Sequence, residues 1–580
     1  MRKRVGKLVT ASVILLTFSA LIYGQNESAP ASASQSAGTT PVFRSSSRLV
    51  LLDVVVTDHH GAFVPGLKAE DFTVLEDTKA QKVSAFSVHV IPATPKQANP
   101  SLQLPPHQYA NFTSVAQQSD RPVTIVLLDM LNTSGQDQQF SRKQMIKFLQ
   151  GLPQGRPVAL FTLTSKLDMI QGFTADSDTL VKAATAILAK TPLLMSPESQ
   201  AQQDQVDAQV LGGNATPIGR ALQNAVASQD NFQKLERMDM TVDALDVLAR
   251  AVAGYSGRKN LLWLSAEFPV AFGPDLSPYS YSQSSINHQM HDLQNEGRPL
   301  RETAALLAAA QVAVYPVSVS GLASPGTGID ISTATQNLST AQLQRQTANL
   351  SQLQTTAAWD IHEAMTDIAR ETGGEAFYGT NDIKDAMARG MEQGSNYYTL
   401  AYRPNNGNWN GEYRKIEVKT AAAGARITYR RGYYAIPTQP FSGDGATASM
   451  AIAMKFSVPE LTMLFLKAQV LPPNDKNKAV SIDYAVDAHD LAFTDGPDQR
   501  KHAAVDFVAS AWDKDSKLVA HATDTMNTTL RPEAYQEVMR TGLPFHQELQ
   551  LKPGSYTLRL GVLDRGNRKI GTLDVPLTVQ

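Results

Sequence analysis

Residue types able to do chemistry occur at several places along the 580 residues, and most have a structural explanation. His59 and His60 stand in a turn beside Asp58 with no third metal ligand nearby, which is typical of exposed turn histidines. Ser256 lies between glycines but lacks the spacing of a nucleophile elbow, and it precedes its strand where an elbow serine would follow one. The chain has no cysteine, which excludes a thiol nucleophile, a thiolate metal site and a disulfide.

Most charged residues also have a structural explanation, and Asp129 is the exception. Residues 474–477 and 495–498 combine acids with turn residues but lack the ligand spacing of a calcium loop, so ordinary turns are the better interpretation. Arg258 and Lys259 are expected to cover a helix end. Asp129 differs because it follows the continuous apolar run 123–128, the pattern of a strand buried on both faces. Its carboxylate is thereby predicted at the carboxyl end of a strand.

The elements around Asp129 alternate between strand and helix patterns. Predicted strands cover 123–128, 158–162, 260–265, 311–319 and 375–378, and predicted helices cover 141–152, 176–190, 241–253, 302–310 and 362–371. This alternation predicts a Rossmann-like, mainly parallel sheet with helices on both faces. Loops at the carboxyl edge of such a sheet converge, so residues following different strands can form one site.

The flanking sequence predicts a multidomain chain. Residues 42–92 read as a small β domain and 93–120 as a linker. The α/β domain is assigned to 121–435, with a β extension near its end and polar insertions at 273–298 and 324–356. The second insertion also fits a polar helix. Residues 445–580 are predicted to form a β-sandwich.

The amino terminus has the pattern of an export signal. A cluster of basic residues between positions 2 and 7 precedes the apolar run 9–23, which predicts a signal peptide over 1–24. An uncleaved membrane anchor is the alternative, because the two patterns are close in length. Residues 25–41 follow as a flexible leader rich in small residues. We therefore expect a periplasmic, outer-envelope-associated or secreted protein with no membrane span after cleavage.

The overall charge bears on the partners. Lys and Arg total 52 and Asp and Glu total 54, which gives a net charge of −2. Such a chain lacks the positive field that holds polyanions, so a nucleic-acid partner is not expected.

Several local strings and the order of elements together resemble the secreted von Willebrand factor A-related proteins of the acidobacterial type. The strings are Val54-Val55-Val56-Thr57-Asp58, Asp71-Phe72, Val126-Leu127-Leu128-Asp129, the segment 257–265, Thr372-Gly373-Gly374 and Arg431-Gly432-Tyr433-Tyr434. The resemblance spans most of the chain. It implies a leader, a β module, a central A-type α/β domain and a β tail, and it implies no known catalysis.

The resemblance also implies a place for a divalent cation such as Mg²⁺, built from Asp-x-Ser-x-Ser, a later Thr and a later Asp. The matching positions, which form the candidate ligand or metal site, are Asp129, Asn132, Thr133, Thr241 (with Thr216 as a second choice), Ser265 and Glu267. Leu131 replaces the first Ser and cannot coordinate, and Ala266 stands where the family often has Asp. The site is therefore expected to be degenerate, and the domain to bind without a metal or other cofactor.

These observations predict an exported, non-enzymatic protein that binds a protein or an envelope polymer through loops at one edge of the sheet. An envelope-acting hydrolase is the alternative, and it would need paired acids or a nucleophile and base in a cleft. A purely structural envelope component is the third possibility.

Overall fold

The structure is a computed structural model that describes residues 49–91, 104–112, 122–133, 135–190, 236–268, 303–320, 361–436, 444–456, 458–475, 477–496 and 500–580. The predicted signal peptide, the leader, both polar insertions and Thr216 lie outside these residues. Within them, no helix is long and apolar enough to cross a membrane.

A five-stranded sheet lies at the centre of the α/β body, in the order β10-β9-β6-β7-β8. Its strands are β6 (Val123–Asp129), β7 (Val158–Leu163), β8 (Leu167–Thr174), β9 (Lys259–Ser265) and β10 (Val312–Ser318). All neighbours are parallel except β7 and β8, which are antiparallel because only a short turn separates them. The sheet is therefore mixed and mainly parallel.

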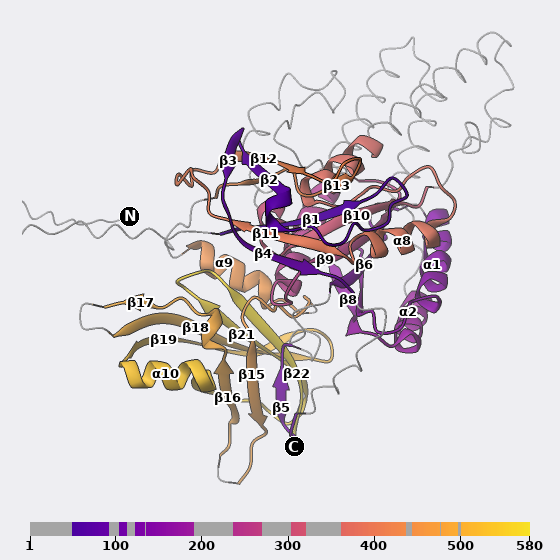
Figure 1. The fold of residues 1–580 in the computed structure, drawn as a ribbon. Helices are drawn as coiled ribbons and strands as arrows, with labels where there is room; N and C mark the ends of the chain where they lie inside the picture. The colour runs from indigo at the N-terminus through magenta and orange to yellow at the C-terminus, as the bar shows by residue number, and fades with distance from the viewer. Residues whose placement is uncertain are drawn as a thin grey trace, which may run out of the picture. The chain divides into compact units, whose positions relative to one another are not determined.

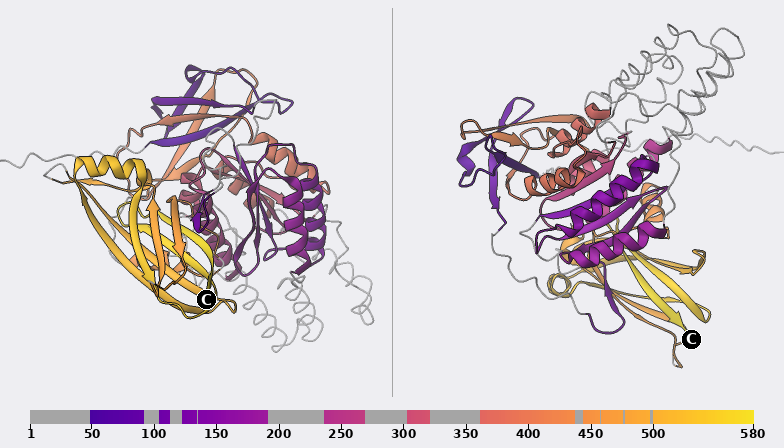
Figure 2. Two further views of the ribbon diagram at one scale, coloured as in Figure 1. Left: turned by 90° about the horizontal axis from the view of Figure 1, so that it is seen from below. Right: turned by 90° about the vertical axis from the view of Figure 1, so that its right-hand side faces the viewer.

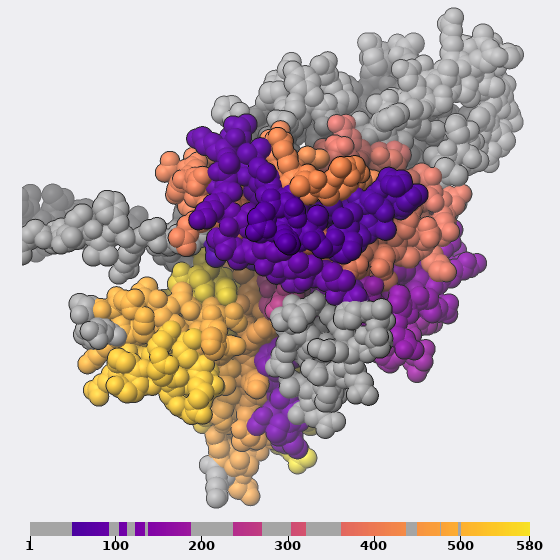
Figure 3. All heavy atoms as spheres, in the orientation of Figure 1, coloured from indigo at the N-terminus to yellow at the C-terminus, as the bar shows by residue number. Residues whose placement is uncertain are grey.

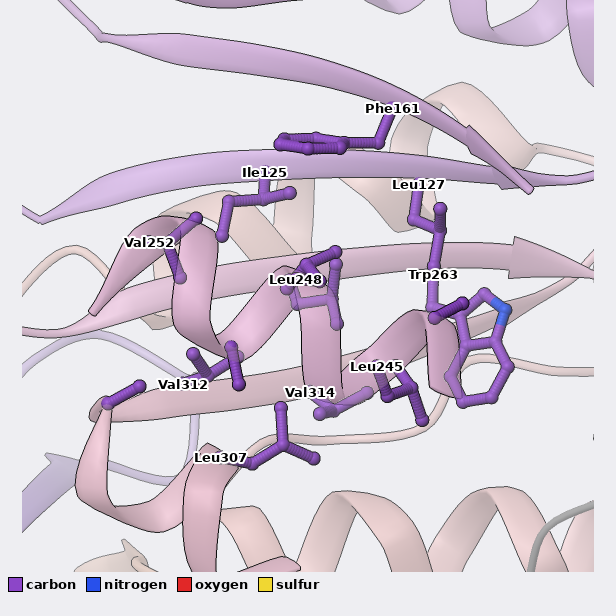
Figure 4. Packing of buried hydrophobic residues seen from close by; sticks show 14 of the residues in the cluster. Ile125, Leu127, Phe161, Leu245, Leu248, Val252, Trp263, Leu307, Val312 and Val314 are labelled. Carbon is purple, nitrogen blue, oxygen red and sulfur yellow. The ribbon is translucent and has the colours of Figure 1, made fainter. Parts of the chain in front are cut away.

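Helices cover both faces of this sheet because its strands alternate apolar side chains to either side. They are α1 (Gly135–Gln150), α2 (Ser177–Lys190), α8 (Ile383–Gln393) and the helices over residues 236–252, 303–309 and 361–372. Ile125 and Leu127 face a cluster with Leu245 and Leu248, from the helix over 236–252. Val126 and Leu128 face the opposite cluster, to which α1, α2 and α8 contribute. Figure 4 shows part of the first cluster, and Figure 2 shows helices on both sides of the sheet.

An antiparallel sandwich accompanies this body (Figure 1), and it joins segments far apart in the chain. One sheet has the order β13-β1-β11-β4 and the other β14-β12-β2-β3. The early strands are β1 (Val50–Thr57), β2 (Phe72–Glu76), β3 (Lys79–Gln81) and β4 (Val83–His89), with a short 3-10 turn at Ala69–Asp71. The late strands are β11 (Tyr397–Tyr402), β12 (Tyr413–Thr420), β13 (Arg426–Thr428) and β14 (Gly432–Tyr434).

This pairing corrects the predicted division between a β domain at 42–92 and a β extension inside 121–435. β1 pairs with β11 and β13, and β2 pairs with β12, so neither segment closes its sheets alone. Val54, Val74, Tyr398 and Ile416 share one buried core. The physical reason is that an isolated run of short strands lacks enough apolar area to fold independently.

The carboxyl-terminal part forms a second antiparallel sandwich. One sheet has the order β20-β16-β15-β5, and the other has β17-β18-β21-β22 with β19 also paired to β18. The strands are β15 (Leu466–Leu471), β16 (Val480–Val486), β17 (Thr494–Asp495), β18 (Lys501–Asp513), β19 (Leu518–Leu530), β20 (Leu543–Leu549), β21 (Gly554–Asp564) and β22 (Ile570–Val579). Its helical elements are α9 (Asp444–Ala453), a 3-10 turn at Ala488–Asp490 and α10 (Pro532–Thr541).

One strand of this sandwich comes from the segment predicted as a linker. β5 (Gln108–Ala110) lies within 93–120 and pairs antiparallel with β15, which places Tyr109 opposite Ala468. A three-residue strand carries too little pattern to be seen in a polar sequence, and its position depends on the partner that it meets.

Candidate functional site

The predicted site residues Asp129 and Ser265 lie side by side at the carboxyl edge of the central sheet. Asp129 is the last residue of β6 and Ser265 the last of β9. The two strands are parallel neighbours, with Leu128 in register with Leu264. Adjacent parallel strands end at the same edge, so the sequence alone was sufficient to bring these residues together.

The Asp129 carboxylate is fully buried and accepts hydrogen bonds from four directions. Its Oδ1 accepts from the backbone N–H of Asn132 at 3.0 Å. Its Oδ2 accepts from Asn132 Nδ2 at 2.8 Å and from Trp263 Nε1 at 3.0 Å. The Ser265 hydroxyl oxygen lies 3.1 Å from Oδ2 and also within hydrogen-bond distance of the Glu267 carbonyl, so its one proton serves either acceptor in turn.

The loop after β6 is held by its own polar side chains. Thr133 Oγ1 donates to the Asp129 carbonyl and accepts from the backbone N–H of Ala266. Gln138, in the first turns of α1, donates through Nε2 to the carbonyls of Met130 and Thr133. Short polar side chains favour such local bonds to the backbone, which explains why the sequence turns tightly here.

Thr241 joins the cluster through Asn132. The Asn132 side chain donates from Nδ2 to Thr241 Oγ1 at 3.1 Å. The Thr241 hydroxyl donates in turn to the carbonyl of Arg237, one turn earlier in the helix over 236–252. Five of the six predicted residues therefore form one hydrogen-bonded network, which we call the Asp129 network: Asp129, Asn132, Thr133, Thr241 and Ser265.

The sixth predicted residue takes a different partner. Glu267 is partly exposed, and its Oε2 lies 3.9 Å from an Nη of the buried Arg237. Its backbone N–H donates to the carbonyl of Asn132. Ala266 occupies the position where a second carboxylate would follow β9. The Glu267 side chain is thus paired with a cation at the border of the Asp129 network.

Burial dominates the electrostatics of Asp129. Desolvation raises the pKa of its carboxyl group, and the hydrogen bonds from Asn132, Trp263 and Ser265 act in the opposite direction. All four donor groups are neutral. Hydrogen bonds from neutral groups, and not a paired cation among the described residues, therefore stabilise the Asp129 carboxylate.

The residues present do not fit a divalent cation. Mg²⁺ requires near-octahedral oxygen ligands, whereas Asn132 and Trp263 direct N–H groups at the Asp129 carboxylate. Leu131 offers no ligand, and Asn132 Oδ1 is the one buried side-chain oxygen of the Asp129 network without a hydrogen-bond partner. Among the described residues, no group of three or more His, Cys, Asp or Glu side chains could hold a metal ion.

Sequence reasoning missed Trp263 as a member of the site. It lies in the middle of β9 and is fully buried, with its ring against Phe268 and near Leu245 (Figure 4). A buried indole N–H needs an acceptor, and that requirement is the one sequence signal that could have pointed to Asp129. Arg237 was also missed, because nothing in a helical pattern shows which polar residue faces a neighbouring loop.

The comparisons with known proteins identify no family. No family model matches the chain, and no curated protein matches it. The chain is similar in structure to an aerotolerance-related membrane protein of Bacteroides fragilis, with 10% identity, a TM-score of 0.24 and coverage of 47% of this chain and 98% of that one.

Two pilus proteins also match. One is the PilB minor pilin of Streptococcus sanguinis, with 10% identity, a TM-score of 0.23 and coverage of 48% of this chain and 62% of that one. The other is the type V pili tip protein Mfa5 of Porphyromonas gingivalis, with 9% identity, a TM-score of 0.18 and coverage of 86% and 78%. At such low scores these distant likenesses carry no argument, so the assignment of a mixed, mainly parallel α/β fold depends on the strand order and core described above.

Proposed function

We propose that this chain is an exported, non-enzymatic binding protein whose α/β body is an A-type domain that works without a bound metal. The strand order, the antiparallel edge strand β8 and the helices on both faces support the A-type assignment. The basic and apolar amino-terminal segment supports export. The ligand class is a protein or an envelope polymer, bound at the carboxyl edge of the sheet.

One observation carries the metal-independent part of this proposal. The Asp129 carboxylate is fully buried and is already bonded to neutral donors from β9 and from its own loop. A cation bound at Oδ2 would displace the Asn132 amide and the Trp263 indole, which leaves two buried N–H groups without acceptors. Each such orphaned group costs about 1–3 kcal/mol.

Calorimetric titration with Mg²⁺ or Mn²⁺ tests the metal-independent part. After treatment with a chelator, the wild type and Asp129→Ala should give the same heat as buffer. Micromolar binding in the wild type that Asp129→Ala abolishes would overturn the proposal.

Recovery of partners from an envelope extract tests the place of binding. Glu267→Lys reverses a charge at the carboxyl edge of the sheet, and Glu417→Lys makes the same change at an exposed position of β12 as a matched control. We expect Glu267→Lys to lose partners that the wild type and Glu417→Lys retain, with or without chelator. Equal recovery by all three proteins contradicts binding at this edge.

A further inference from the structure

A second polar site lies away from the Asp129 network, on the sandwich that β1–β4 form with β11–β14. A surface cavity of about 290 Å³ is lined by Glu76, Asp77, Lys79, Gln81, Asn405 and Asn406. The first four come from the β2–β3 hairpin, and the last two from the loop that follows β11. In Figure 3 the indigo β2–β3 region and orange segments lie next to each other on this face.

Two of the lining side chains, those of Gln81 and Asn405, are bonded to the backbone. Gln81 Oε1 accepts from the backbone N–H of Asn405 at 3.0 Å, and Gln81 Nε2 donates to the Lys79 carbonyl at 3.1 Å. Asn405 Nδ2 donates to the carbonyl of Ala80. These bonds hold the late loop against the hairpin, so the cavity is preformed.

The turn of the β2–β3 hairpin is also held in a defined conformation. Asp77 and Thr78 both have positive φ, at 46° and 69°, as a two-residue turn between right-twisted strands requires. The backbone N–H of Asp77 donates to the Lys415 carbonyl, and Asp77 Oδ1 accepts from the backbone N–H of Lys415. Asp77 Oδ2 is left to meet a ligand.

The groups that remain available are of mixed type. Among the residues that the structure describes, none bonds to the Lys79 ammonium, and Asn406 uses Oδ1 to accept from Asn408, which leaves its Nδ2 donor. Asp77 Oδ2 supplies an acceptor. A ligand for this cavity must therefore both donate and accept hydrogen bonds at closely spaced positions, as the hydroxyl groups of a sugar do.

The charge and the volume of the cavity restrict the class of ligand further. Glu76 is paired with Arg414 at 3.4 Å, and Asp77 and Lys79 carry opposite charges, so the lining has no net charge that would select a strongly charged ligand. All six lining residues carry polar side-chain groups that can form hydrogen bonds. Drug-sized ligands occupy cavities of about 300–1,000 Å³, so this cavity suits a ligand of one ring.

We propose that this cavity binds a neutral sugar ring, either as a free monosaccharide or as the terminal unit of a glycan. The proposal goes beyond the binding proposed at the carboxyl edge of the sheet, because it concerns another body of the chain and a defined ligand class. The Asp77, Lys79 and Asn406 side chains would hold the hydroxyl groups.

Saturation-transfer NMR on the full-length protein tests this proposal. The probes are glucose, galactose, mannose and N-acetylglucosamine, each at roughly 10 mM, because one ring with few contacts binds in the millimolar range. The methyl glycosides of the same sugars form a second arm. Transfer to the glycosides as well indicates a glycan terminus, and transfer to the free sugars alone indicates a monosaccharide.

Two variants and a matched control locate the binding. Lys79→Ala and Asp77→Asn alter exposed lining residues, and Lys82→Ala removes an exposed lysine three positions away that does not line the cavity. We expect at least a threefold loss of transfer in the first two variants and no change in the third. Absence of transfer from every probe, or undiminished transfer in both lining variants, would overturn the proposal. Neither result depends on the Asp129 network.

Discussion

Two buried carboxylates in different bodies of this protein are stabilised in opposite ways. Asp129, at the edge of the α/β sheet, accepts only from neutral groups: an amide, an indole, a hydroxyl and a backbone N–H. Glu76, inside the sandwich, accepts from the Tyr402 and Tyr433 hydroxyls at 2.8 and 2.9 Å and faces the Arg414 guanidinium at 3.4 Å. Both side chains are essentially inaccessible to solvent.

This difference shows that the burial of a carboxylate does not by itself reveal its role in the protein. Glu76 has a dedicated counter-ion, and Arg414 is itself held by the carbonyls of Asn406 and Asn408 and stacks over Trp409. That arrangement is a structural cross-link between β2 and β12. Asp129 has no such cation among its hydrogen-bond partners and organises a loop at a sheet edge, where binding residues gather in α/β folds.

Burial also affects the pKa values of the two tyrosines beside Glu76. Burial, with the nearby Glu76 charge, raises the pKa of both Tyr402 and Tyr433 well above the ordinary value. Their hydroxyls therefore remain protonated donors at neutral pH, and Glu76 keeps both hydrogen bonds.

Removing the cation from the Glu76 cluster should have the largest effect. Arg414→Met leaves a buried carboxylate with hydroxyl partners alone, and we expect it to lower the free energy of unfolding by about 3–5 kcal/mol. Urea unfolding followed by far-ultraviolet circular dichroism measures the loss. The double variant Glu76→Gln/Arg414→Met should lose less than Arg414→Met does. A single-variant loss below about 1 kcal/mol contradicts a buried ion pair at this position.

Lys259 offers a third buried charge, and burial lowers its pKa from 10.5 to about 7. Below pH 7 the folded state bears the cost of a buried ammonium, and this cost disappears as pH rises from about 7 to 10.5, because the unfolded state then holds more protons. Lys259→Met should therefore stabilise the protein at or below neutral pH by about 2–4 kcal/mol, with the gain shrinking in alkali.

Urea midpoints across the pH range measure the Lys259 effect. Lys82→Met, at an exposed position, provides the control and should leave the pH dependence unchanged. A gain from Lys259→Met that stayed constant up to strongly alkaline pH would contradict the role assigned to its charge.

Because the hydrogen-bond donors to Asp129 are neutral, we expect the isosteric change Asp129→Asn to lower the free energy of unfolding by less than Arg414→Met does. Asp129→Asn places an NH₂ group against donors already directed at Oδ2 or Oδ1, and we expect a loss of about 1–3 kcal/mol. Because the folded-state pKa of Asp129 is raised, the wild type loses stability as pH rises through that pKa, and the variant should lack this dependence. Circular dichroism during urea unfolding at several pH values measures both effects.

The smallest effect is expected for Trp263→Phe. Phenylalanine keeps an aromatic ring beside Phe268 but removes one donor to the Asp129 carboxylate, a hydrogen bond worth about 1.5 kcal/mol. Circular dichroism in urea measures the loss, because the substitution itself changes the tryptophan fluorescence. If Asp129→Asn/Trp263→Phe lost the full sum of the two single changes, the two side chains would not act through a shared hydrogen bond.

Much of the Asp129 network was predictable because it depends on strand ends. Apolar runs such as 123–128 mark strands buried on both faces, and neighbouring parallel strands end at one edge. Asn132 and Thr133 follow Asp129 directly, so their proximity is local. Thr241 required the further step of identifying a helix against the same sheet.

Other features could not be predicted from local pattern. The pairing of Glu267 with Arg237 depends on where a helix face meets a loop. The cavity at the β2–β3 hairpin joins Gln81 to Asn405 across more than three hundred residues, and no periodicity links them.

The sequence by itself determined the alternation of strand and helix, the two buried faces of the central sheet and the carboxyl-edge position of Asp129 and Ser265. These properties follow from side-chain period and strand polarity, which are local. Only the tertiary structure decided that β1 completes a sheet with β11, that β5 joins β15, and that the Trp263 indole bonds to the Asp129 carboxylate. Such contacts minimise the free energy of the whole chain, because buried polar groups and strand edges take partners from wherever packing brings them.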